Sequence, residues 1–424
     1  MRLSSIGERM ASMSGLRSIM EDIDTSMAQS GAGQWLNLSI GNPALIGEVV
    51  QTWRHLVAQA LAGDFGATSC QYGSPRGTPQ LVQAIADYFN RRYAWGIGAE
   101  NIAVGPGSQM LCFIAGAVYA GPGAAGRTRI VLPAAPDYTG YQGLCMHPGG
   151  LVGVEAAVQK GEGRYFRYAM DPQAVERCAD MGLMLVSSPS NPAGRCLSAQ
   201  EMQTLIRLAE RRGIPLLVDH AYGEPIPQIG RTLTPPAFHP NVINCFTLSK
   251  AGIPGERLAF AIGAPDVIAP MVSFLANSAL HASKLAQSAV AIGLQSGELD
   301  TIVTSVIRPF YATRRKTAEK LLADAMPPSV DWRLHAGEGG MFCWVWVDED
   351  WFDDLSLYQL LKRKHVFVAL GRSFFAEPSE QPRLPLHATQ CFRIALTMDE
   401  DVLAEGITRI AAAIEELRAS ACRS

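Results

Sequence analysis

The middle of the chain alternates short apolar runs with longer amphipathic stretches. Each apolar run has the length of one buried strand, and each amphipathic stretch has room for one helix. This alternation is typical of a mostly parallel sheet covered by helices, an α/β fold. The runs that we expect to be strands are 130–132, 183–187, 215–218, 242–248 and 258–262.

Two of the amphipathic stretches carry signals for where a helix begins or ends. Ser198 can cap a helix over 198–212, Glu201 completes a capping box, and Gly213 ends the helix. Another helix is expected over 78–93.

The pattern changes near residue 300. A long helical stretch over 301–325 leads to expected strands over 341–347, 366–370 and 391–396 and a last helix over 399–419. We therefore expect a large domain over 46–300 and a smaller α+β domain over 301–424. Residues 1–45 carry little regular pattern, which predicts an arm that returns to the small domain or to a partner subunit.

Composition limits the kinds of partner. The chain has 424 residues, of which 48% are hydrophobic and 18% charged, and a net charge of −3. These values indicate a globular protein and give no electrostatic reason to expect nucleic acid or a membrane as partner. Nine scattered cysteines and eight histidines show no metal-ligand spacing, so no metal site is expected. Unpatterned cysteines and the lack of an apolar signal segment predict a cytoplasmic protein.

Lys250 is the strongest candidate for chemistry. It follows an expected buried strand, where burial disfavours the ammonium form of its side chain. Thr247, Ser249 and Arg257 lie close to it in the sequence and could hold an anion. A lysine in this setting can form a Schiff base with a carbonyl cofactor whose phosphate is bound nearby. The alternative is a lysine in an ordinary surface loop.

Three more polar residues follow expected strands, where open α/β sheets bind their ligands. Asp219 would either cap the next helix or pair with an arginine, or else hold a protonated pyridine nitrogen. Tyr222 could reach a ring oxygen. Asn191, in an Asn-Pro-Ala-Gly turn, could donate its amide to the same oxygen.

A glycine-rich turn, Gly107-Ser108-Gln109, opens an apolar helix over 110–120. Such a turn leaves backbone N–H groups free to bind an anion. It matches neither a Walker loop nor a dinucleotide fingerprint, so nucleotide binding gains little support.

Tyr138, Tyr72 and Arg393 each allow a structural and a functional interpretation. Tyr138 follows a strand and either packs or stacks on a flat ring. Tyr72 lies in a turn-rich loop that could be ordinary surface. Arg393 interrupts an apolar strand, either as half of a salt bridge at a sheet edge or as a bidentate receptor for a carboxylate.

Taken in chain order, these motifs resemble the class I (fold-type I) pyridoxal-phosphate-dependent aminotransferases over nearly the full length. The resemblance implies a large domain with a mostly parallel seven-stranded sheet between helices, plus a smaller α+β domain. Within this class, residues 15–22, 41–44, 138–141 and 390–393 resemble the valine–pyruvate aminotransferases.

The resemblance also implies a role for each residue. Lys250 would form the Schiff base with pyridoxal phosphate and shuttle the proton at the substrate α-carbon. Asp219 would hold the pyridinium, Tyr138 would stack on the ring, and Asn191 and Tyr222 would contact the ring oxygen. The phosphate would be bound by Gly107, Ser108, Gln109, Thr247, Ser249 and Arg257, with Tyr72 reaching across from the partner of a homodimer.

The substrate side is implied in the same way. Arg393 would bind the α-carboxylate of the amino acid, and Gly41, Asn42 and Asn191 would line the substrate. Leu370 stands where many relatives have proline and is expected to face the substrate. The activity implied is transfer of the amino group of a small or apolar amino acid, of the valine or alanine type, to a 2-oxo acid.

Two alternatives stay open at this point. The same residues would serve a pyridoxal-phosphate-dependent lyase or cyclase that acts by elimination or replacement. A ligand-sensing domain of a transcription regulator is disfavoured, because no basic recognition helix precedes the matching region.

Overall fold

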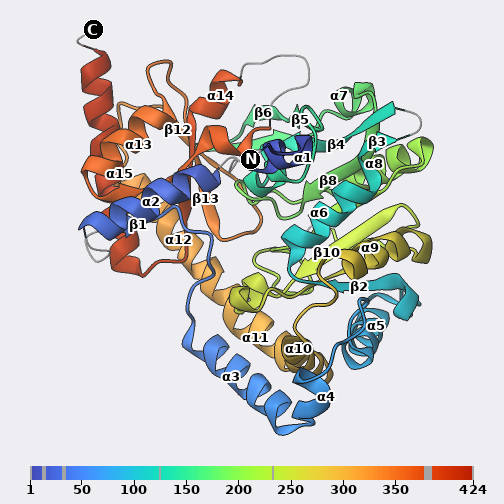
Figure 1. The fold of residues 1–424 in the computed structure, drawn as a ribbon. Coiled ribbons are helices and arrows are strands. Elements are labelled where there is room, and N and C mark those ends of the chain that lie inside the picture. The colour runs from blue at the N-terminus through green and yellow to red at the C-terminus, as the bar shows by residue number, and fades with distance from the viewer. Residues whose placement is uncertain are drawn as a thin grey trace.

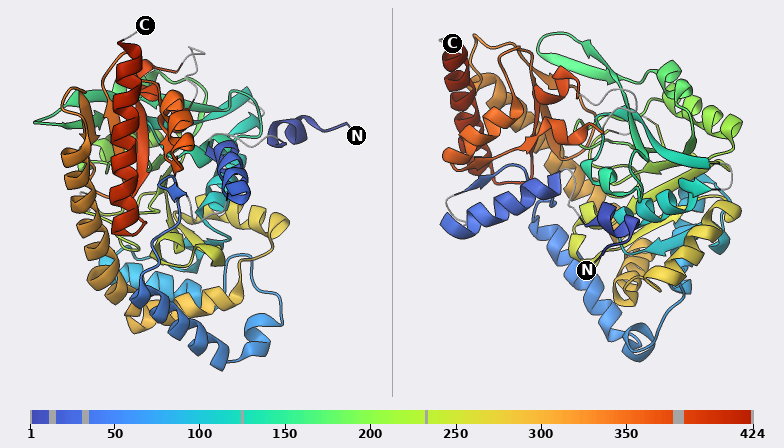
Figure 2. Two further views of the ribbon diagram at one scale, coloured as in Figure 1. Left: turned by 90° about the vertical axis from the view of Figure 1, so that its left-hand side faces the viewer. Right: turned by 45° about the horizontal axis from the view of Figure 1, so that its top comes forward.

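The computed structural model describes residues 2–11, 16–30, 35–123, 126–231, 234–376 and 384–422. Gly15 of the 15–22 segment lies outside these residues. Two sheets lie next to each other, and helices pack around them (Figures 1 and 2). None of the described helices combines the length and the apolar character that crossing a membrane requires.

The larger sheet confirms the predicted α/β class. Its order is β2-β11-β10-β9-β8-β4, with β5 and the short β3 both beside β4. Strands β10, β9, β8, β4 and β5 are mutually parallel, whereas β11 is antiparallel to both of its neighbours. The strands are β2 (Ile102–Gly105), β3 (Gly121–Gly123), β4 (Gly126–Ala135), β5 (Leu151–Glu155), β8 (Met181–Ser187), β9 (Leu216–Asp219), β10 (Val242–Thr247) and β11 (Ala259–Ile262).

The number of strands differs from the seven that were predicted. Among the described residues this sheet has eight strands, because β3 folds back as an antiparallel partner of β4. The five strands predicted from apolar runs are all present. Neither β2 nor β5 was predicted.

Helices cover both faces of this sheet, which is why its central strands β8, β9, β10 and β11 are fully buried and largely apolar. In β11, Phe260 and Ile262 face the helices α3 (Gly47–Ala62), α5 (Pro79–Tyr93) and α10 (Lys284–Ser296). On the same strand, Ala259 and Ala261 face α6 (Ser108–Tyr119) and α9 (Pro265–Ser278). Alternate side chains of one strand therefore enter two separate cores.

The helix boundaries read from the sequence are confirmed. Helix α8 (Ala199–Arg212) begins with the capping box of Ser198 and Glu201 and ends at Gly213, which has the left-handed φ of 62°. Helix α5 begins after Thr78, whose side chain accepts from the backbone of Leu81. The helix expected over 301–325 is made of α11 (Glu298–Ile302), a π-helical segment (Val303–Ile307) and α12 (Arg308–Ala325).

The second sheet has the order β15-β16-β13-β12-β7-β6. Its C-terminal strands are β12 (Trp332–His335), β13 (Phe342–Val347), β15 (Ala369–Leu370) and β16 (Cys391–Ala395), accompanied by α13 (Asp354–Arg363) and α15 (Glu400–Ala421). Strands β6 (Ala157–Lys160) and β7 (Tyr165–Ala169) come from the middle of the chain, and β7 pairs in parallel with β12. This pairing was not predicted. The domain limits at residues 45 and 300 stay predictions.

The N-terminal arm has more regular structure than the sequence suggested. It contains helices α1 (Ser5–Met10) and α2 (Leu16–Ser30) and strand β1 (Leu36–Asn37), none of which was predicted. Strand β1 pairs in parallel with β14 (Val366–Phe367). Helix α2 lies beside the second sheet, where Ile23 packs with Tyr358, Phe367 and Leu370. Burial of Ile23 is the reason that α2 docks there rather than extending into solvent.

Candidate active site

The predicted site residues gather around a single cavity of about 510 Å³ at the carboxyl ends of the parallel strands. Parallel strands deliver their following loops to one edge of the sheet, so residues far apart in the sequence meet there. The predicted residues that line this cavity are Gly41, Asn42, Ser108, Gln109, Tyr138, Asn191, Asp219, Tyr222, Thr247, Ser249, Lys250, Arg257 and Arg393. Gly107 and Tyr72 do not line it.

Lys250 lies in a short 3₁₀ turn directly after β10. Its Nζ donates a hydrogen bond of 2.7 Å to the carbonyl oxygen of Gly41, which ties the arm to the site. Burial lowers the pKa of Lys250 to about 8, helped by the positive charges of Arg393 and Arg257 and opposed by Asp219. A neutral amine is therefore accessible near neutral pH, and a neutral amine is the form that attacks a carbonyl carbon.

Asp219 ends β9 and is 4% exposed. Its Oδ2 accepts a hydrogen bond of 2.9 Å from the hydroxyl of Tyr141, and its Oδ1 accepts one of 3.0 Å from the backbone N–H of Ala221. The thiol of Cys112 lies 4.0 Å from Oδ2. Burial raises the pKa of Asp219 to about 6, against the lowering effect of Tyr141, Ala221 and Lys250. The hydrogen bonds from Tyr141 and Ala221 thus fix the orientation of the carboxylate, which still lines the cavity.

A group of donors suited to an anion lies at the N-terminus of α6. The Thr247 hydroxyl lies 3.0 Å from that of Ser249, and Arg257 Nη1 donates to Ser249 Oγ at 3.3 Å. Gly107 precedes α6 with φ of 91°, and a Cβ there would lie 2.3 Å from Arg257 Nη2. Gly107 therefore acts by leaving room for Arg257, which explains why it does not line the cavity itself.

Three tyrosines line the cavity, Tyr138, Tyr141 and Tyr222. The Tyr138 ring packs edge-on against Tyr141 with 5.2 Å between ring centroids, and Gly140 lies so close to Tyr138 that a Cβ would approach its ring to 2.3 Å. Tyr222 is 5% exposed, and burial raises the pKa of its hydroxyl well above the ordinary 10.0. The Tyr222 hydroxyl can therefore act as a neutral donor.

Arg393 lies in β16, between β13 and β15, and not at a sheet edge. Its Nη1 donates to Asn191 Oδ1 at 2.7 Å and its Nη2 to the carbonyl oxygen of Ser39 at 2.6 Å. Phe342 and Phe374 flank the guanidinium, whose carbon lies 3.8 Å and 5.0 Å from the two ring centroids. Burial lowers the pKa of Arg393 to about 10. No carboxylate among the described residues pairs with it, so the salt-bridge interpretation fails.

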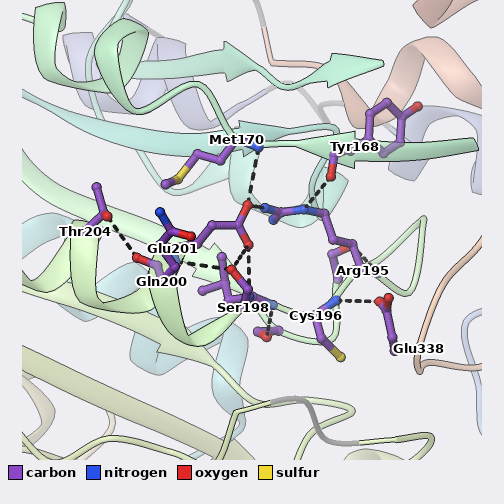
Figure 3. A network of polar contacts seen from close by, with 12 residues as sticks. Tyr168, Met170, Arg195, Cys196, Ser198, Gln200, Glu201, Thr204 and Glu338 are labelled. Atoms are coloured by element: carbon purple, nitrogen blue, oxygen red, sulfur yellow. Dashed lines mark hydrogen bonds and ion pairs between the residues drawn. The ribbon is translucent and has the colours of Figure 1, made fainter. Parts of the chain in front are cut away.

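The turn that carries Asn191 is held by a polar network between α8 and the second sheet (Figure 3). Arg195 forms an ion pair with Glu201 and donates through Nε to the carbonyl oxygen of Tyr168 on β7, at 3.2 Å. Glu338 accepts from the backbone of Cys196 at 3.2 Å. At Gly194, φ is 70° and a Cβ would lie 2.1 Å from the carbonyl oxygen of Gly339. The pairing of β7 with β12 therefore supports the loop that faces Arg393.

Two predicted residues occupy other positions. Tyr72 is 86% exposed and packs edge-on near His281, with 6.1 Å between ring centroids, so it does not reach the cavity of its own chain. Leu370, which was expected to face the substrate, is buried beneath Ile23 of the arm instead. It supports the cavity wall without lining it.

Sequence reasoning missed several lining residues, among them Tyr141 and the arm residues Met20, Ile23, Asp24, Asn37, Ser39 and Ile40. One signal could have identified Tyr141, which lies three residues after Tyr138. A buried carboxylate such as Asp219 requires hydrogen-bond donors, and Tyr141 is a nearby donor in the sequence motif of Tyr138. The arm residues gave no such signal, because only the path of the chain brings them to the cavity.

The arrangement fits pyridoxal phosphate. The donors around Arg257 suit a phosphate, and the buried carboxylate of Asp219 in the same cavity suits a pyridinium nitrogen. Among the described residues that line the cavity, two buried polar atoms lack hydrogen-bond partners, Gln109 Oε1 and Arg393 Nε, as is common where a ligand completes the hydrogen bonds. Among the residues that the structure describes, no group of three or more His, Cys, Asp or Glu side chains could hold a metal ion.

Comparison with known proteins agrees with this geometry. The family model for class I and II aminotransferases matches residues 33–410. Valine–pyruvate aminotransferase of Escherichia coli (strain K12) is 29% identical over 98% of each chain. A putative amino-acid aminotransferase of Psychrobacter arcticum 273-4 has a similar solved structure, with a TM-score of 0.92, 28% identity and 99% of each chain covered.

A second solved structure supports the same assignment. Valine–pyruvate aminotransferase of Salmonella typhimurium LT2 has a TM-score of 0.83 and 27% identity, covering 93% of this chain and 99% of the other. The fold-type I architecture, the pyridoxal-phosphate cofactor and the aminotransferase class are thereby established. The chain belongs to the class I and II aminotransferases.

Proposed function

We propose that this protein transfers the α-amino group of a small or apolar amino acid, of the valine or alanine type, to a 2-oxo acid in two ping-pong half-reactions. The observation that carries the proposal is the pair of Lys250 and Arg393 in one cavity. An amine and a guanidinium on facing elements match the α-carbon and the α-carboxylate of one amino acid.

Each residue has a task in this proposal. When bound, pyridoxal phosphate supplies an electron-accepting ring that stabilises charge developing at the substrate α-carbon. Lys250 Nζ holds the cofactor between turnovers and carries the proton to and from the α-carbon during them. Asp219 keeps a negative charge at the pyridine nitrogen, and Tyr141 orients Asp219. Tyr138, Asn191 and Tyr222 fix the ring.

The remaining residues bind and position the two ends of the cofactor and substrate. Arg393 holds the α-carboxylate, with Phe342 and Phe374 keeping its planar fork in place. Gly41 and Asn42 line the substrate side, and the carbonyl of Gly41 is the hydrogen-bond partner from which Lys250 must be released. The phosphate is bound by Ser108, Gln109, Thr247, Ser249 and Arg257, with Gly107 providing room.

The substrate preference rests on the apolar part of the cavity and on the relatives. Met20, Ile23 and Ile40 line the cavity, and burial of apolar substrate groups against them would favour binding. The relatives matched over nearly the whole chain in Escherichia coli and Salmonella typhimurium are named valine–pyruvate aminotransferases.

A homodimer is part of the proposal. The exposed Tyr72, too far from its own cavity to line it, would reach the phosphate site of a second copy. A cytoplasmic location stays a prediction from the sequence.

The deciding experiment is a panel of amino donors and oxo-acid acceptors. With an amino donor alone, the holoenzyme should release one equivalent of oxo acid per subunit and no ammonia, and continued turnover should require an acceptor. Continuous ammonia release from the donor alone would instead establish the lyase alternative, which uses the same lysine, aspartate and arginine.

A further inference from the structure

One wall of the cavity is made by the N-terminal arm and not by either sheet. Met20, Ile23 and Asp24 of α2 all line the cavity. Their spacing of three and four residues places them on one face of the helix. Helix α2 lies beside the second sheet (Figures 1 and 2), and its three residues line the same cavity as Lys250 and Asp219.

An ion pair between Asp22 and Lys362 holds helix α2 against helix α13. Asp22 accepts from Lys362 Nζ at 2.6 Å and from the Tyr358 hydroxyl at 2.8 Å. Hydrogen bonding to Lys362 lowers the pKa of Asp22. Asp22 is thereby neutralised by α13, whereas Asp24, two residues later and on a different face of the helix, has no cation paired with it among the described residues.

The charges that line the cavity are unevenly distributed. Its cations are Lys250, Arg257 and Arg393, and each has a task at the cofactor or at the α-carboxylate. Its acids are Asp219, held by Tyr141 on the cofactor side, and Asp24 on the arm. A substrate with a second carboxylate would therefore meet Asp24 and no unassigned cation among the described lining residues.

From this distribution we propose that Asp24 is a specificity-determining residue that excludes dicarboxylic amino acids and oxo acids by charge repulsion. The inference rests on the proposed function, since it concerns the side chain of an amino acid held through its α-carboxylate by Arg393. Met20 and Ile23 favour an apolar side chain, and Asp24 beside them disfavours an anionic one. The acceptor is accordingly a 2-oxo acid with an uncharged side chain, such as pyruvate, and not 2-oxoglutarate, which carries a second carboxylate.

The test compares two neutralised positions on the same helix. Asp24→Asn removes the carboxylate that lines the cavity, and Glu21→Gln removes an exposed carboxylate of α2 that does not line it. For each holoenzyme, one measures the ratio of kcat/KM for glutamate to kcat/KM for valine. We expect Asp24→Asn to raise this ratio about tenfold and Asp24→Lys to raise it roughly a hundredfold, while Glu21→Gln leaves it unchanged. Because both kcat/KM values are measured on the same sample, the concentration of folded enzyme cancels in their ratio.

A binding measurement gives an independent readout. Calorimetric titration of the holoenzymes with succinate and with isobutyrate should show about tenfold tighter succinate binding in Asp24→Asn and no change for isobutyrate. Equal ratios in Asp24→Asn, Asp24→Lys and Glu21→Gln would overturn the assignment of Asp24. Failure of the wild-type holoenzyme to transaminate any amino acid would instead overturn the proposed function, and the succinate and isobutyrate titrations would still decide the role of Asp24.

Discussion

The hydroxyl of Tyr141 donates to Oδ2 of Asp219 over 2.9 Å, across 78 residues of sequence. Tyr141 is 1% exposed, so this hydrogen bond is shielded from water and fixes one oxygen of the carboxylate. It also opposes the rise in the pKa of Asp219 that burial causes. The ability of Asp219 to stay ionised, which the proposed function requires, therefore depends partly on Tyr141.

Removing this hydroxyl should change the pH profile as well as the rate. In Tyr141→Phe the pKa of Asp219 should rise above about 6, because the hydrogen bond that favours its charged form is lost. We expect the acidic limb of the kcat/KM profile to move to higher pH and kcat to fall about tenfold. Tyr119→Phe, which removes a hydroxyl bonded to the carbonyl of Val267, is the matched control. Identical pH profiles for the two variants would contradict a positioning role for Tyr141.

Attachment of the cofactor should follow the ionisation of Lys250. The pKa of Lys250 is lowered to about 8, so the fraction of neutral amine rises as pH increases through that value. The rate at which the apoprotein takes up pyridoxal phosphate should rise with the same midpoint.

Lys250→Ala should lack the visible absorption of lysine-bound cofactor altogether. Lys364→Ala, in which an ion pair with Glu416 is removed, should keep it. Persistence of the band in Lys250→Ala would show that another amine holds the cofactor.

Asp219 should destabilise the folded apoprotein at neutral and alkaline pH. Its folded pKa of about 6 lies above the ordinary 3.8, so the folded state binds the proton more tightly than the unfolded chain does. Its contribution to the free energy of unfolding is therefore fully present below about pH 4 and is lost as the pH rises through 6. Asp219→Asn should raise the free energy of unfolding of the apoprotein by about 2 kcal/mol near pH 8, with little difference near pH 4. Thermal unfolding at both pH values measures this, and an equal difference at both would contradict it.

Arg393 should be replaceable by neither alanine nor lysine. Its two Nη atoms already bind Asn191 and Ser39, so its place and orientation are set before any substrate arrives. Arg393→Ala should raise KM for the amino donor roughly a hundredfold, and Arg393→Lys should recover little, because an ammonium lacks the planar fork. Full recovery by lysine would indicate that only the positive charge is needed.

The dimer can be tested by mixing two impaired variants. If Tyr72 acts in the site of its partner, a hybrid of Lys250→Ala and Tyr72→Ala subunits contains one site with both defects and one intact site. Subunit exchange should then restore up to about half of the activity of one wild-type dimer to each hybrid. Activity that stays at the sum of the two parents after exchange would place Tyr72 outside the site.

Local signals explain why much of the site could be predicted. Asp219 ends a buried strand, Lys250 and Asn191 lie within four residues after one, and Ser108 opens a helix. Strand burial and helix caps depend on residues close in sequence. The resemblance to aminotransferases rests on the same local motifs. Alternating apolar runs and helices likewise predicted the parallel core of the large sheet.

The arm and the joining of the two sheets depended on tertiary structure. Residues Met20, Ile23 and Asp24 reach the cavity only because Asp22 and Ile23 dock on α13 and on Leu370. Strands β6 and β7 join the second sheet through partners more than 150 residues away, Leu334 and His335. Such contacts are decided by which apolar faces remain to be buried once the chain has collapsed, and no short segment encodes that. The amino acids of the chain thus mark the lysine and the strand-end residues of the proposed site by local pattern, whereas the cavity wall formed by the arm exists only in the folded protein.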